Sequence, residues 1–213
     1  MNMIKASASL GLIASAVWPL MGACAAQSSD YVGVELGLIS KPDTVHFRIN
    51  VWDLDGDIPT NHEIDRGVVV GHQFNPNFAV EVGYRDLGTL SGPLKSPPGS
   101  NPEQGDFRLT FKGPQLALVG ILPFGHHWEV YGKLGTMMTD THLSLDASGE
   151  AGVAHLRTSV WNAAVTGAAG IRILISSHWD VGLAEGAFRN LGKTHETGSV
   201  ILKSTNLALR YHF

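Results

Sequence analysis

The stretch 115–135 constrains the fold more than any other part of the chain, because it reads as two strands joined by a tight turn at 124–127. In the second strand Trp128, Val130, Leu134 and Thr136 fall on one face, and Glu129, Tyr131 and Lys133 fall on the other. A period of two indicates a strand whose faces meet different surroundings. In a soluble sandwich the apolar face would cover a core. In a membrane barrel it would face lipid, and the polar face would line the interior.

The rest of the chain repeats this pattern and gives eight expected strands. They cover residues 31–38, 67–74, 78–88, 107–122, 128–139, 158–175, 179–190 and 199–213. The connections at 75–77, 124–127 and 176–178 are short, whereas those at 40–64, 89–106, 141–157 and 191–198 are longer and polar. Connections that alternate between short and long are typical of an up-and-down transmembrane barrel, which has turns on the periplasmic side and loops outside.

Aromatic residues flank the short turns, as expected of a girdle at the membrane interface. They are Phe74, Phe78, Phe124, Trp128, Trp179, Tyr211 and Phe213. We therefore predict an all-β fold, a single eight-stranded antiparallel up-and-down transmembrane β-barrel, and we expect it to be a monomer. A soluble periplasmic β-sandwich, in which these aromatic side chains would be core residues, is the structural alternative.

The N-terminus, residues 1–26, reads as a secretory signal peptide. Lys5 supplies a positive charge, an apolar stretch follows at 6–21, and small residues at 22–26 form a cleavage zone. We expect the cut after Ala25 or Ala26. The chain is therefore expected to leave the cytoplasm, with a short membrane anchor as the alternative.

The remaining residues, 27–213, are expected to form the barrel domain. Cys24 is the single cysteine, so the mature chain is expected to have no disulfide. A lipoprotein that keeps Cys24 as its lipidated first residue is the alternative. The formal net charge of −4 gives no electrostatic reason to expect a nucleic-acid partner.

Several short stretches resemble the OmpA-type eight-stranded outer-membrane barrels. They are Gly-Tyr-Arg-Asp-Leu-Gly at 83–88, Leu-Pro-Phe and Trp-x-Val-Tyr-Gly-Lys-Leu-Gly within 122–135, Gly-Ile-Arg at 170–172 and the terminal Arg-Tyr-His-Phe. The resemblance covers essentially the whole mature chain and implies the bacterial outer membrane, with its lipid and lipopolysaccharide as partners. It also implies that Tyr211 and Phe213 form a signal for the barrel-assembly machinery. The chain stops at Phe213, so we expect no peptidoglycan-binding domain and no wall-anchoring role.

Ionisable residues on the polar faces are the first candidate site. Alternation assigns to the barrel interior Glu35, Glu81, Arg85, Glu129, Lys133, Arg172 and Arg210. Asp180 and Glu185 cannot share that face without a bulge, and we expect Glu185 to point inward. An eight-stranded barrel is just wide enough to be filled by its own side chains, and buried charges must be paired. We therefore expect a plug of ion pairs, with a narrow or gated pore as the alternative.

Two further sets of residues are candidates for chemistry. Asp53, Asp55 and Asp57 alternate as calcium ligands can, but Ile58 and Ile64 stand where an EF-hand loop needs Gly and Glu. A lipid A-modifying enzyme needs His beside a nucleophile or carboxylate, and His62-Glu63 and His195-Glu196 are the adjacent pairs. His46, His62, His142, His155 and His195 are all expected to lie in solvated loops. We expect no metal, no cofactor and no catalytic residue.

The long loops are the remaining functional candidates, because binding is often located in loops on a rigid scaffold. The stretch 91–102 is rich in Pro and Gly, and 46–52 is apolar enough to pack on the rim or to meet a partner. The leading hypothesis is a structural and surface-interactive protein that supports envelope integrity and binds extracellular molecules through its loops. A narrow porin-like channel for small solutes is the second hypothesis, and a lipid A-modifying enzyme is the third.

Overall fold

The computed structural model describes residues 29–40, 44–49, 52–57, 63–95, 104–149, 152–192 and 200–213. Ten strands occupy these ranges. They are β1 (Ser29–Ser40), β2 (Thr44–Ile49), β3 (Trp52–Asp57), β4 (Glu63–Asn75), β5 (Phe78–Lys95), β6 (Gln104–Phe124), β7 (Trp128–Gly149), β8 (Gly152–Leu174), β9 (Trp179–Leu191) and β10 (Val200–His212). Within these ranges no helix is long and apolar enough to cross a lipid bilayer. The expected signal peptide, 1–26, lies outside them.

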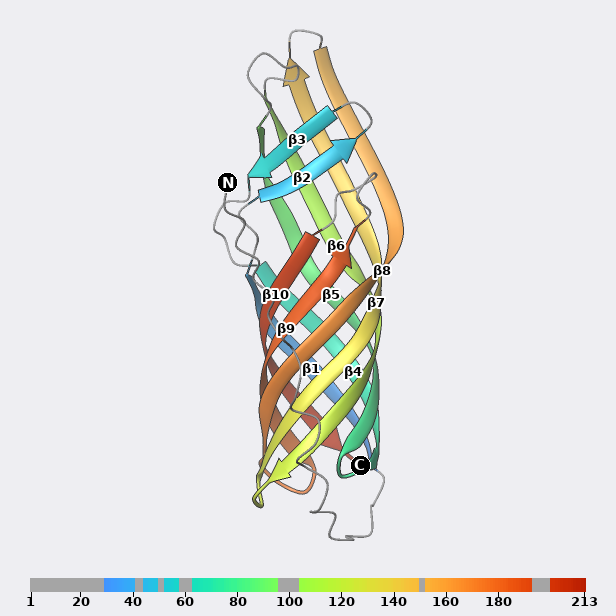
Figure 1. Cartoon of the computed structure of the whole chain (residues 1–213), viewed down its shortest axis with the longest axis vertical. Coiled ribbons are helices and arrows are strands. Elements are labelled where there is room, and N and C mark those ends of the chain that lie inside the picture. The colour runs from blue at the N-terminus through green and yellow to red at the C-terminus, as the bar shows by residue number, and fades with distance from the viewer. Residues whose placement is uncertain are drawn as a thin grey trace, which may run out of the picture.

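Eight of the strands close into a ring (Figure 1). The order around the ring is β4, β1, β10, β9, β8, β7, β6 and β5, and β5 pairs with β4 to complete it. Every pairing is antiparallel. The predicted eight-stranded antiparallel barrel is confirmed. Closure lets the backbone groups of the wall satisfy one another, which a bilayer requires.

The outer face of the lower barrel is apolar. On β1, for example, Val32, Val34, Leu36 and Leu38 are 43–56% exposed, and the alternate residues turn inward. The aromatic residues expected beside the short turns also lie on the outer face. Phe74, Phe78, Phe124, Trp128, Trp179, Tyr211 and Phe213 are each at least 37% exposed. An apolar band bordered by aromatic rings fits a bilayer and its interface.

The upper barrel continues where the sequence suggested long loops. Strands β6, β7 and β8 have 21, 22 and 23 residues, whereas about 9–11 are enough to cross a bilayer. The expected loop at 141–157 is therefore wrong over most of its length, because β7 and β8 remain paired from Thr141 and Val160 up to Gly149 and Gly152. The expected loop at 89–106 is shortened in the same way by pairing between β5 and β6.

The reason for this error is a change in which face is apolar. On the upper part of β7, Leu143 and Leu145 point inward and are buried, while His142 and Asp146 point outward. The period of two is unbroken, but the polar residues have moved to the outer face. The extension thus has the pattern of a soluble barrel, as expected for a wall that stands in water above the membrane.

The first long connection contains a hairpin that the sequence pattern did not predict. Strands β2 and β3 pair with each other from Thr44 and Asp57 to Ile49 and Trp52. The end of β3 also pairs with the end of β5, through Asp55 opposite Lys95. In Figure 1 the hairpin crosses the upper part of the molecule, below the upper ends of the long strands.

Candidate functional site

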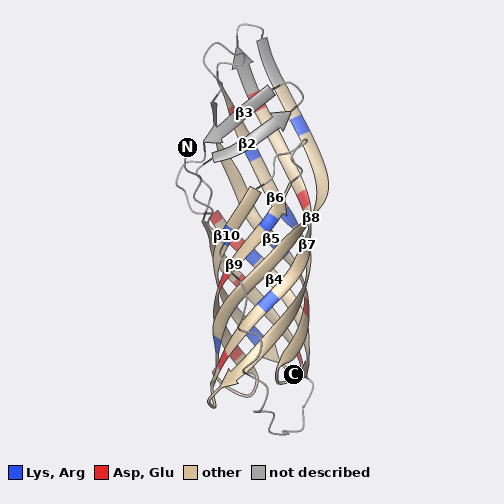
Figure 2. Ribbon diagram, in the orientation of Figure 1, with Lys and Arg blue, Asp and Glu red and all other residues tan. Residues whose placement is uncertain are grey.

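The seven ionisable residues assigned to the interior lie inside the lower barrel. Glu35, Glu81, Arg85, Glu129, Arg172 and Arg210 are at most 9% exposed, and the side chain of Lys133 is also 9% exposed. Strands β1, β5, β7, β8 and β10 carry them. Figure 2 shows acidic and basic positions interspersed along this part of the wall. Alternation within each strand explains the direction of each side chain, because even and odd positions face opposite sides.

Lys133 on β7 links two carboxylates from strands with which β7 does not pair. Its Nζ atom lies 2.8 Å from Oε1 of Glu35 on β1 and 2.5 Å from Oε2 of Glu81 on β5. The hydroxyl of Tyr31 donates a hydrogen bond of 2.9 Å to the other oxygen of Glu81. These contacts cross the barrel interior and hold non-adjacent strands together.

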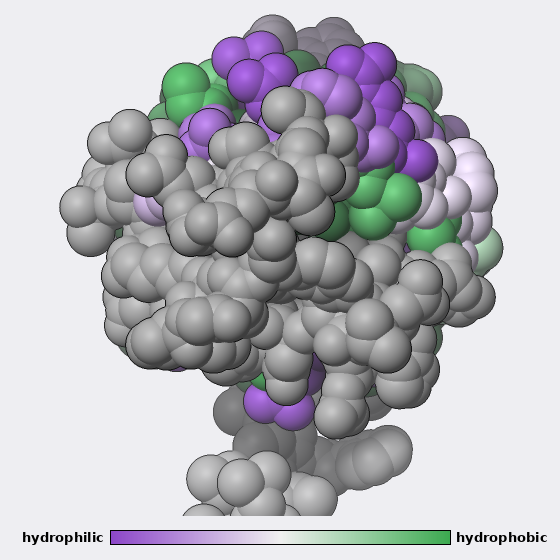
Figure 3. Space-filling model, turned by 90° about the horizontal axis from the view of Figure 1, so that it is seen from above, coloured by the Kyte–Doolittle hydropathy of each residue, from purple (hydrophilic) through white to green (hydrophobic). Residues whose placement is uncertain are grey.

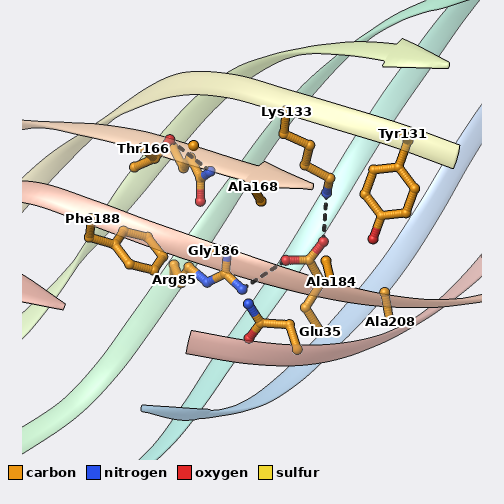
Figure 4. A pocket seen from close by; sticks show the side chains of 13 residues that line it. Glu35, Arg85, Tyr131, Lys133, Thr166, Ala168, Ala184, Gly186, Phe188 and Ala208 are labelled. Atoms are coloured by element: carbon orange, nitrogen blue, oxygen red, sulfur yellow. Dashed lines mark hydrogen bonds and ion pairs between the residues drawn. The ribbon is translucent and has the colours of Figure 1, made fainter. Parts of the chain in front are cut away.

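Arg85 on β5 approaches Glu35 from another direction, as Figure 4 shows. Its Nη2 atom is 2.9 Å from Oε2 of Glu35, and its Nε atom donates to Oδ1 of Asp65 at 2.8 Å. The guanidinium also lies over the ring of Phe188, 5.3 Å from its centroid. Glu35 therefore receives a cation on each of its two oxygens, which offsets the cost of burying it.

Nearer the periplasmic turns, Arg210 on β10 bonds Oδ1 of Asp180 at 3.1 Å, and His212 contacts Oδ2 of the same carboxylate at 2.7 Å. Arg172 forms an ion pair with Glu129 on the adjacent strand. Nitrogen atoms of Arg210 also lie 3.6 Å from a carboxylate oxygen of Glu35 and 3.7 Å from one of Glu81. The ion pairs near the turns are therefore continuous with those around Lys133.

The expectation that Glu185 points inward is wrong. Asp180 is fully buried, whereas Glu185 is exposed and accepts a hydrogen bond of 2.6 Å from the hydroxyl of Thr205. Strand β9 pairs with β8 without a bulge from Asp180 to Arg189, so its even-numbered residues all turn inward. Asp180 takes that face because Arg210 and His212 are there to pair with it.

Sequence reasoning missed three other members of the network. Asp65 is fully buried on β4, but the sequence pattern starts this strand at residue 67 and leaves Asp65 in a loop. Tyr31 and His212 lie on faces that alternation identifies as interior, yet the prediction covered only formally charged groups. Among the described residues, the ion-pair network thus contains five carboxylates (Glu35, Asp65, Glu81, Glu129, Asp180) and four permanent cations (Arg85, Lys133, Arg172, Arg210), together with His212.

Little space remains within this network. A cavity of about 20 Å³ lies among Glu35, Arg85, Lys133 and Tyr131, which is room for about one water molecule. Above it the interior is apolar and tightly buried. This upper layer consists of Ile39, Leu87, Leu90, Phe107, Leu109, Phe111, Met137, Leu143, Leu145, Ala164, Phe188, Leu191, Val200 and Leu202. Among the described residues, an ion-pair layer and an apolar layer thus fill the barrel one above the other.

The periplasmic end is hollowed. A pocket of about 490 Å³ opens there beneath Arg172 and Glu129, with His178, His212 and Phe213 among its lining. It is a vestibule below the ion-pair layer. In the part of the chain that the structure describes, no group of three or more His, Cys, Asp or Glu side chains is arranged to hold a metal ion.

On the outer face of the extension, Asp140 accepts hydrogen bonds from two partners. His142 contacts its Oδ2 at 2.9 Å, and the hydroxyl of Ser159 donates to its Oδ1 at 3.0 Å.

The expectation that His142 and His155 lie in loops is wrong, because His142 is on β7 and His155 is on β8. Seen from above, hydrophilic side chains gather along one margin of the described surface (Figure 3).

The remaining candidate residues from the sequence are not described by the structure, or are described through their backbone alone. His62, His195, Glu196 and Ile58 are outside the described residues, as is most of the Pro/Gly-rich stretch. Asp53, Asp55 and Asp57 lie on β3, where the backbone alone is described.

Comparison with known proteins agrees with the geometry. A family model described as OmpA-like transmembrane domain matches residues 25–213. The outer membrane protease OmpT from Escherichia coli shares the fold with a TM-score of 0.56 and 12% identity, over 87% of this chain and 97% of that one. Neisserial surface protein A (TM-score 0.51, 11% identity, 87% and 97% covered) and OprG from Pseudomonas aeruginosa (0.51, 12%, 87% and 96%) are also similar. At these identities the likeness concerns the fold alone. No curated protein sequence matches the chain.

Proposed function

Because the chain belongs to the family of OmpA-like transmembrane domains and is an integral β-barrel of the bacterial outer membrane, we propose that its role is structural and surface-interactive. In this role the barrel does not conduct solutes. It contributes to envelope integrity, and its extracellular end binds molecules outside the cell. Outer-membrane lipid, lipopolysaccharide and the barrel-assembly machinery are the partners of the mature chain 27–213, which acts as a monomer.

The filled interior is the observation that carries this proposal. The ion pairs of Glu35 and Glu81 with Lys133 span the lower barrel, and apolar side chains such as Phe107 and Phe111 occupy the interior above them. Moving an ion through the apolar layer would strip its hydration without replacing it, which is costly. The described interior therefore supports a plug more than a pore.

The tall extension supports the surface role. Strands β6, β7 and β8 have 21, 22 and 23 residues, about twice the 9–11 residues that a strand needs to cross a bilayer. The wall of the barrel therefore extends beyond the membrane. This part of the wall presents polar side chains such as His142 and Asp146, together with the β2–β3 hairpin, to the outside. A protein whose only task was to fill space in the membrane would not need this height.

Planar-bilayer recording of the purified mature protein tests the closed barrel. We expect no steady conductance in KCl solution for correctly folded protein, identified by its shift in SDS gel mobility on boiling. A matched variant, Lys133→Ala with Glu35→Ala, removes the central pair but leaves the apolar layer above it in place, and we expect it to remain closed. Steady single-channel steps from the native protein would favour the second candidate, a narrow channel.

Deletion of the gene tests the envelope role. We expect increased sensitivity to detergent and to large antibiotics, restored by the native protein and also by a variant that lacks β2 and β3. Loss of surface binding in that variant, with envelope integrity intact, would separate the two parts of the role. Unchanged sensitivity in the deletion strain would contradict the structural part.

A further inference from the structure

The vestibule at the periplasmic end of the barrel has the size of a small-molecule site. Its volume is about 490 Å³, and pockets that hold small ligands in proteins usually measure about 300–1,000 Å³. The ion-pair layer above it leaves a cavity of only about 20 Å³. In Figure 1 this end of the barrel is the lower one, where the C-terminus is marked. The vestibule is therefore a blind site that opens toward the periplasm.

The polar groups at the upper end of the vestibule are only partly used within the protein. Arg172 is 2% exposed, and its Nε atom donates to Oε2 of Glu129, its cross-strand neighbour on β7. Among the contacts between described residues, none uses an Nη group of Arg172 or Oε1 of Glu129. Both side chains line the vestibule. The remaining N–H donors of the guanidinium and one carboxylate oxygen are thus left for a ligand.

Unused polar groups also lie on the opposite wall. Ser29 on β1 and Gln73 on β4 are cross-strand neighbours that line the vestibule. Strand β4 lies four strands from β8 around the ring, so Gln73 faces Arg172 across the barrel. Among the described residues, neither the hydroxyl of Ser29 nor the amide of Gln73 has a hydrogen-bond partner. A ligand beside Arg172 can therefore also bind the opposite wall.

The mouth of the vestibule is held in place by the turn between β8 and β9. The hydroxyl of Ser176 accepts hydrogen bonds of 3.2 Å from the backbone N–H groups of His178 and Trp179. The backbone N–H of His212 on β10 donates to the carbonyl oxygen of His178 at 2.7 Å. The site is therefore preformed, and little ordering is needed when a ligand binds.

The charges at the upper end determine which ligand fits. Arg172 and Glu129 neutralise each other, so a ligand with a net charge would leave that charge uncompensated in a partly closed site. A ligand that is neutral overall but carries both signs has no such cost. Its carboxylate can meet the unused N–H groups of Arg172, and its ammonium group can meet the unused oxygen of Glu129.

The spacing of the two charges favours a single amino acid over a peptide. Arg172 and Glu129 are directly opposite each other on paired strands, where Cα atoms are about 4.5–5.5 Å apart. In an α-amino acid the ammonium and carboxylate groups share one carbon atom, whereas each further residue of a peptide separates them by about 3.3 Å more. Leu174 and Phe213 add apolar surface to the lining, which suits an apolar side chain.

We propose that the periplasmic vestibule binds a free α-amino acid with an apolar side chain. Its carboxylate accepts hydrogen bonds from the Nη groups of Arg172, its ammonium group donates to Oε1 of Glu129, and the amide of Gln73 completes the site from the opposite wall. The inference goes beyond the proposed function, because this site lies at the other end of the barrel from the extracellular surface. The filled interior above it leaves the bound molecule no way through, so the vestibule binds the solute without conducting it.

An NMR titration of the mature protein in lipid nanodiscs tests the proposal. L-leucine is the probe, and the readouts are the guanidinium signals of Arg172 and the backbone amides of Leu174 and His212. We expect saturable shifts with a dissociation constant on the order of 0.1–1 mM, which suits a ligand with so few atoms. The probe 4-methylpentanoate lacks the ammonium group and 3-methylbutylamine lacks the carboxylate. Each should bind at least roughly tenfold more weakly than leucine, because each loses a hydrogen bond between charged groups.

A paired substitution removes both charges from the site. Arg172→Gln with Glu129→Gln leaves no buried charge unpaired and should weaken leucine binding at least roughly tenfold. Asp30→Asn with His72→Gln is the matched control. In that pair Nδ1 of His72 lies 2.6 Å from Oδ1 of Asp30 at the same end of the barrel, but both side chains are well exposed and neither lines the vestibule. The control should change binding less than about twofold.

A single substitution on the opposite wall gives a second test that leaves the ion pair intact. Gln73→Leu keeps the approximate size of the side chain and removes its amide. We expect it to weaken leucine binding roughly threefold to tenfold, the effect of one lost hydrogen bond. The shift in gel mobility on boiling shows whether each variant is folded before its titration is read.

Three results would overturn the inference. Leucine in large excess leaves the signals of Arg172 unchanged, or 4-methylpentanoate binds the native protein as tightly as leucine, which would show a site for anions. In the third, the control with Asp30→Asn and His72→Gln weakens binding as much as the paired substitution in the vestibule. Conductance is recorded without leucine, so a conducting barrel would overturn the proposed function while these titrations are judged separately.

Discussion

The ring of Tyr31 lies over Gly71, its cross-strand neighbour on β4, and a Cβ atom placed on Gly71 would overlap the Cζ atom of Tyr31. The missing side chain of the glycine therefore gives the phenol ring its place against the wall. From that place the hydroxyl of Tyr31 reaches Glu81 in the centre of the barrel. Gly71 on β4 thus positions the hydrogen bond that Tyr31 on β1 donates to Glu81 on β5.

Replacing this glycine should destabilise the barrel. We expect Gly71→Ala to displace the Tyr31 ring and to lower the free energy of unfolding by about 1–3 kcal/mol, as overpacking does. Urea unfolding in lipid vesicles, followed by tryptophan fluorescence, measures the change. Gly120→Ala is the matched control, because a Cβ atom there meets nothing within 4 Å. Equal effects at both positions would show that close approach to Tyr31 is not the cause.

Removing the ammonium group of Lys133 should lower the free energy of unfolding more than Gly71→Ala does. Lys133→Met leaves Glu35 and Glu81 without their shared ammonium group, and breaking a buried pair in this way typically costs about 3–5 kcal/mol. The same urea titration checks the result. Lys203→Met changes the same residue type at an exposed site on β10, where substitutions usually stay within about 0.5 kcal/mol. A Lys133 variant as stable as the Lys203 variant would contradict the described network.

Asp180 and Glu185 should respond differently to loss of charge. Asp180→Asn weakens the contacts to Arg210 and His212 inside the barrel, and we expect a loss of roughly 2–3 kcal/mol, the size of a hydrogen bond to a charged group. Glu185→Gln acts on an exposed side chain bonded to Thr205, so we expect a change below about 0.5 kcal/mol. Thermal unfolding of both variants, read from the shift in gel mobility, compares them directly. A Glu185 variant that unfolds as early as the Asp180 variant would argue against this orientation of β9.

Lipid A should be unchanged by this protein. Asp140, His142 and Ser144 occupy alternate positions on the outer face of β7, but His142 bonds Asp140, and the described contacts include no hydrogen bond between His142 and Ser144. In nucleophilic catalysis the nucleophile lies within hydrogen-bond reach of its base, and this contact is often longer before substrate binds. From the proposed structural role we expect the mass spectra of lipid A from cells with and without the protein to coincide. An acyl chain lost in the presence of the native protein and retained with His142→Ala would establish an enzyme instead.

The sequence by itself determined the barrel. The period of two in stretches such as 78–88 and 128–139 tells which side chains share a face, and strict alternation needs no tertiary information. The aromatic residues beside the turns indicated where the membrane ends. Alternation also placed Glu35, Lys133 and Arg210 on inner faces, because neighbouring apolar positions had to face lipid.

Tertiary structure decided which inner residues meet and how far the wall rises. Lys133 and Glu35 are 98 positions apart in the chain, and only the closed ring brings them together. Whether Asp180 or Glu185 points inward depended on Arg210, which lies opposite Asp180 on β10. Alternation along β9 alone gives no information about this neighbour. Above the membrane the apolar and polar faces exchange, so a strand such as 141–149 resembles a polar loop in composition. Its pairing with β8, and the point where β9 turns away at Asn190, are properties of the assembled sheet.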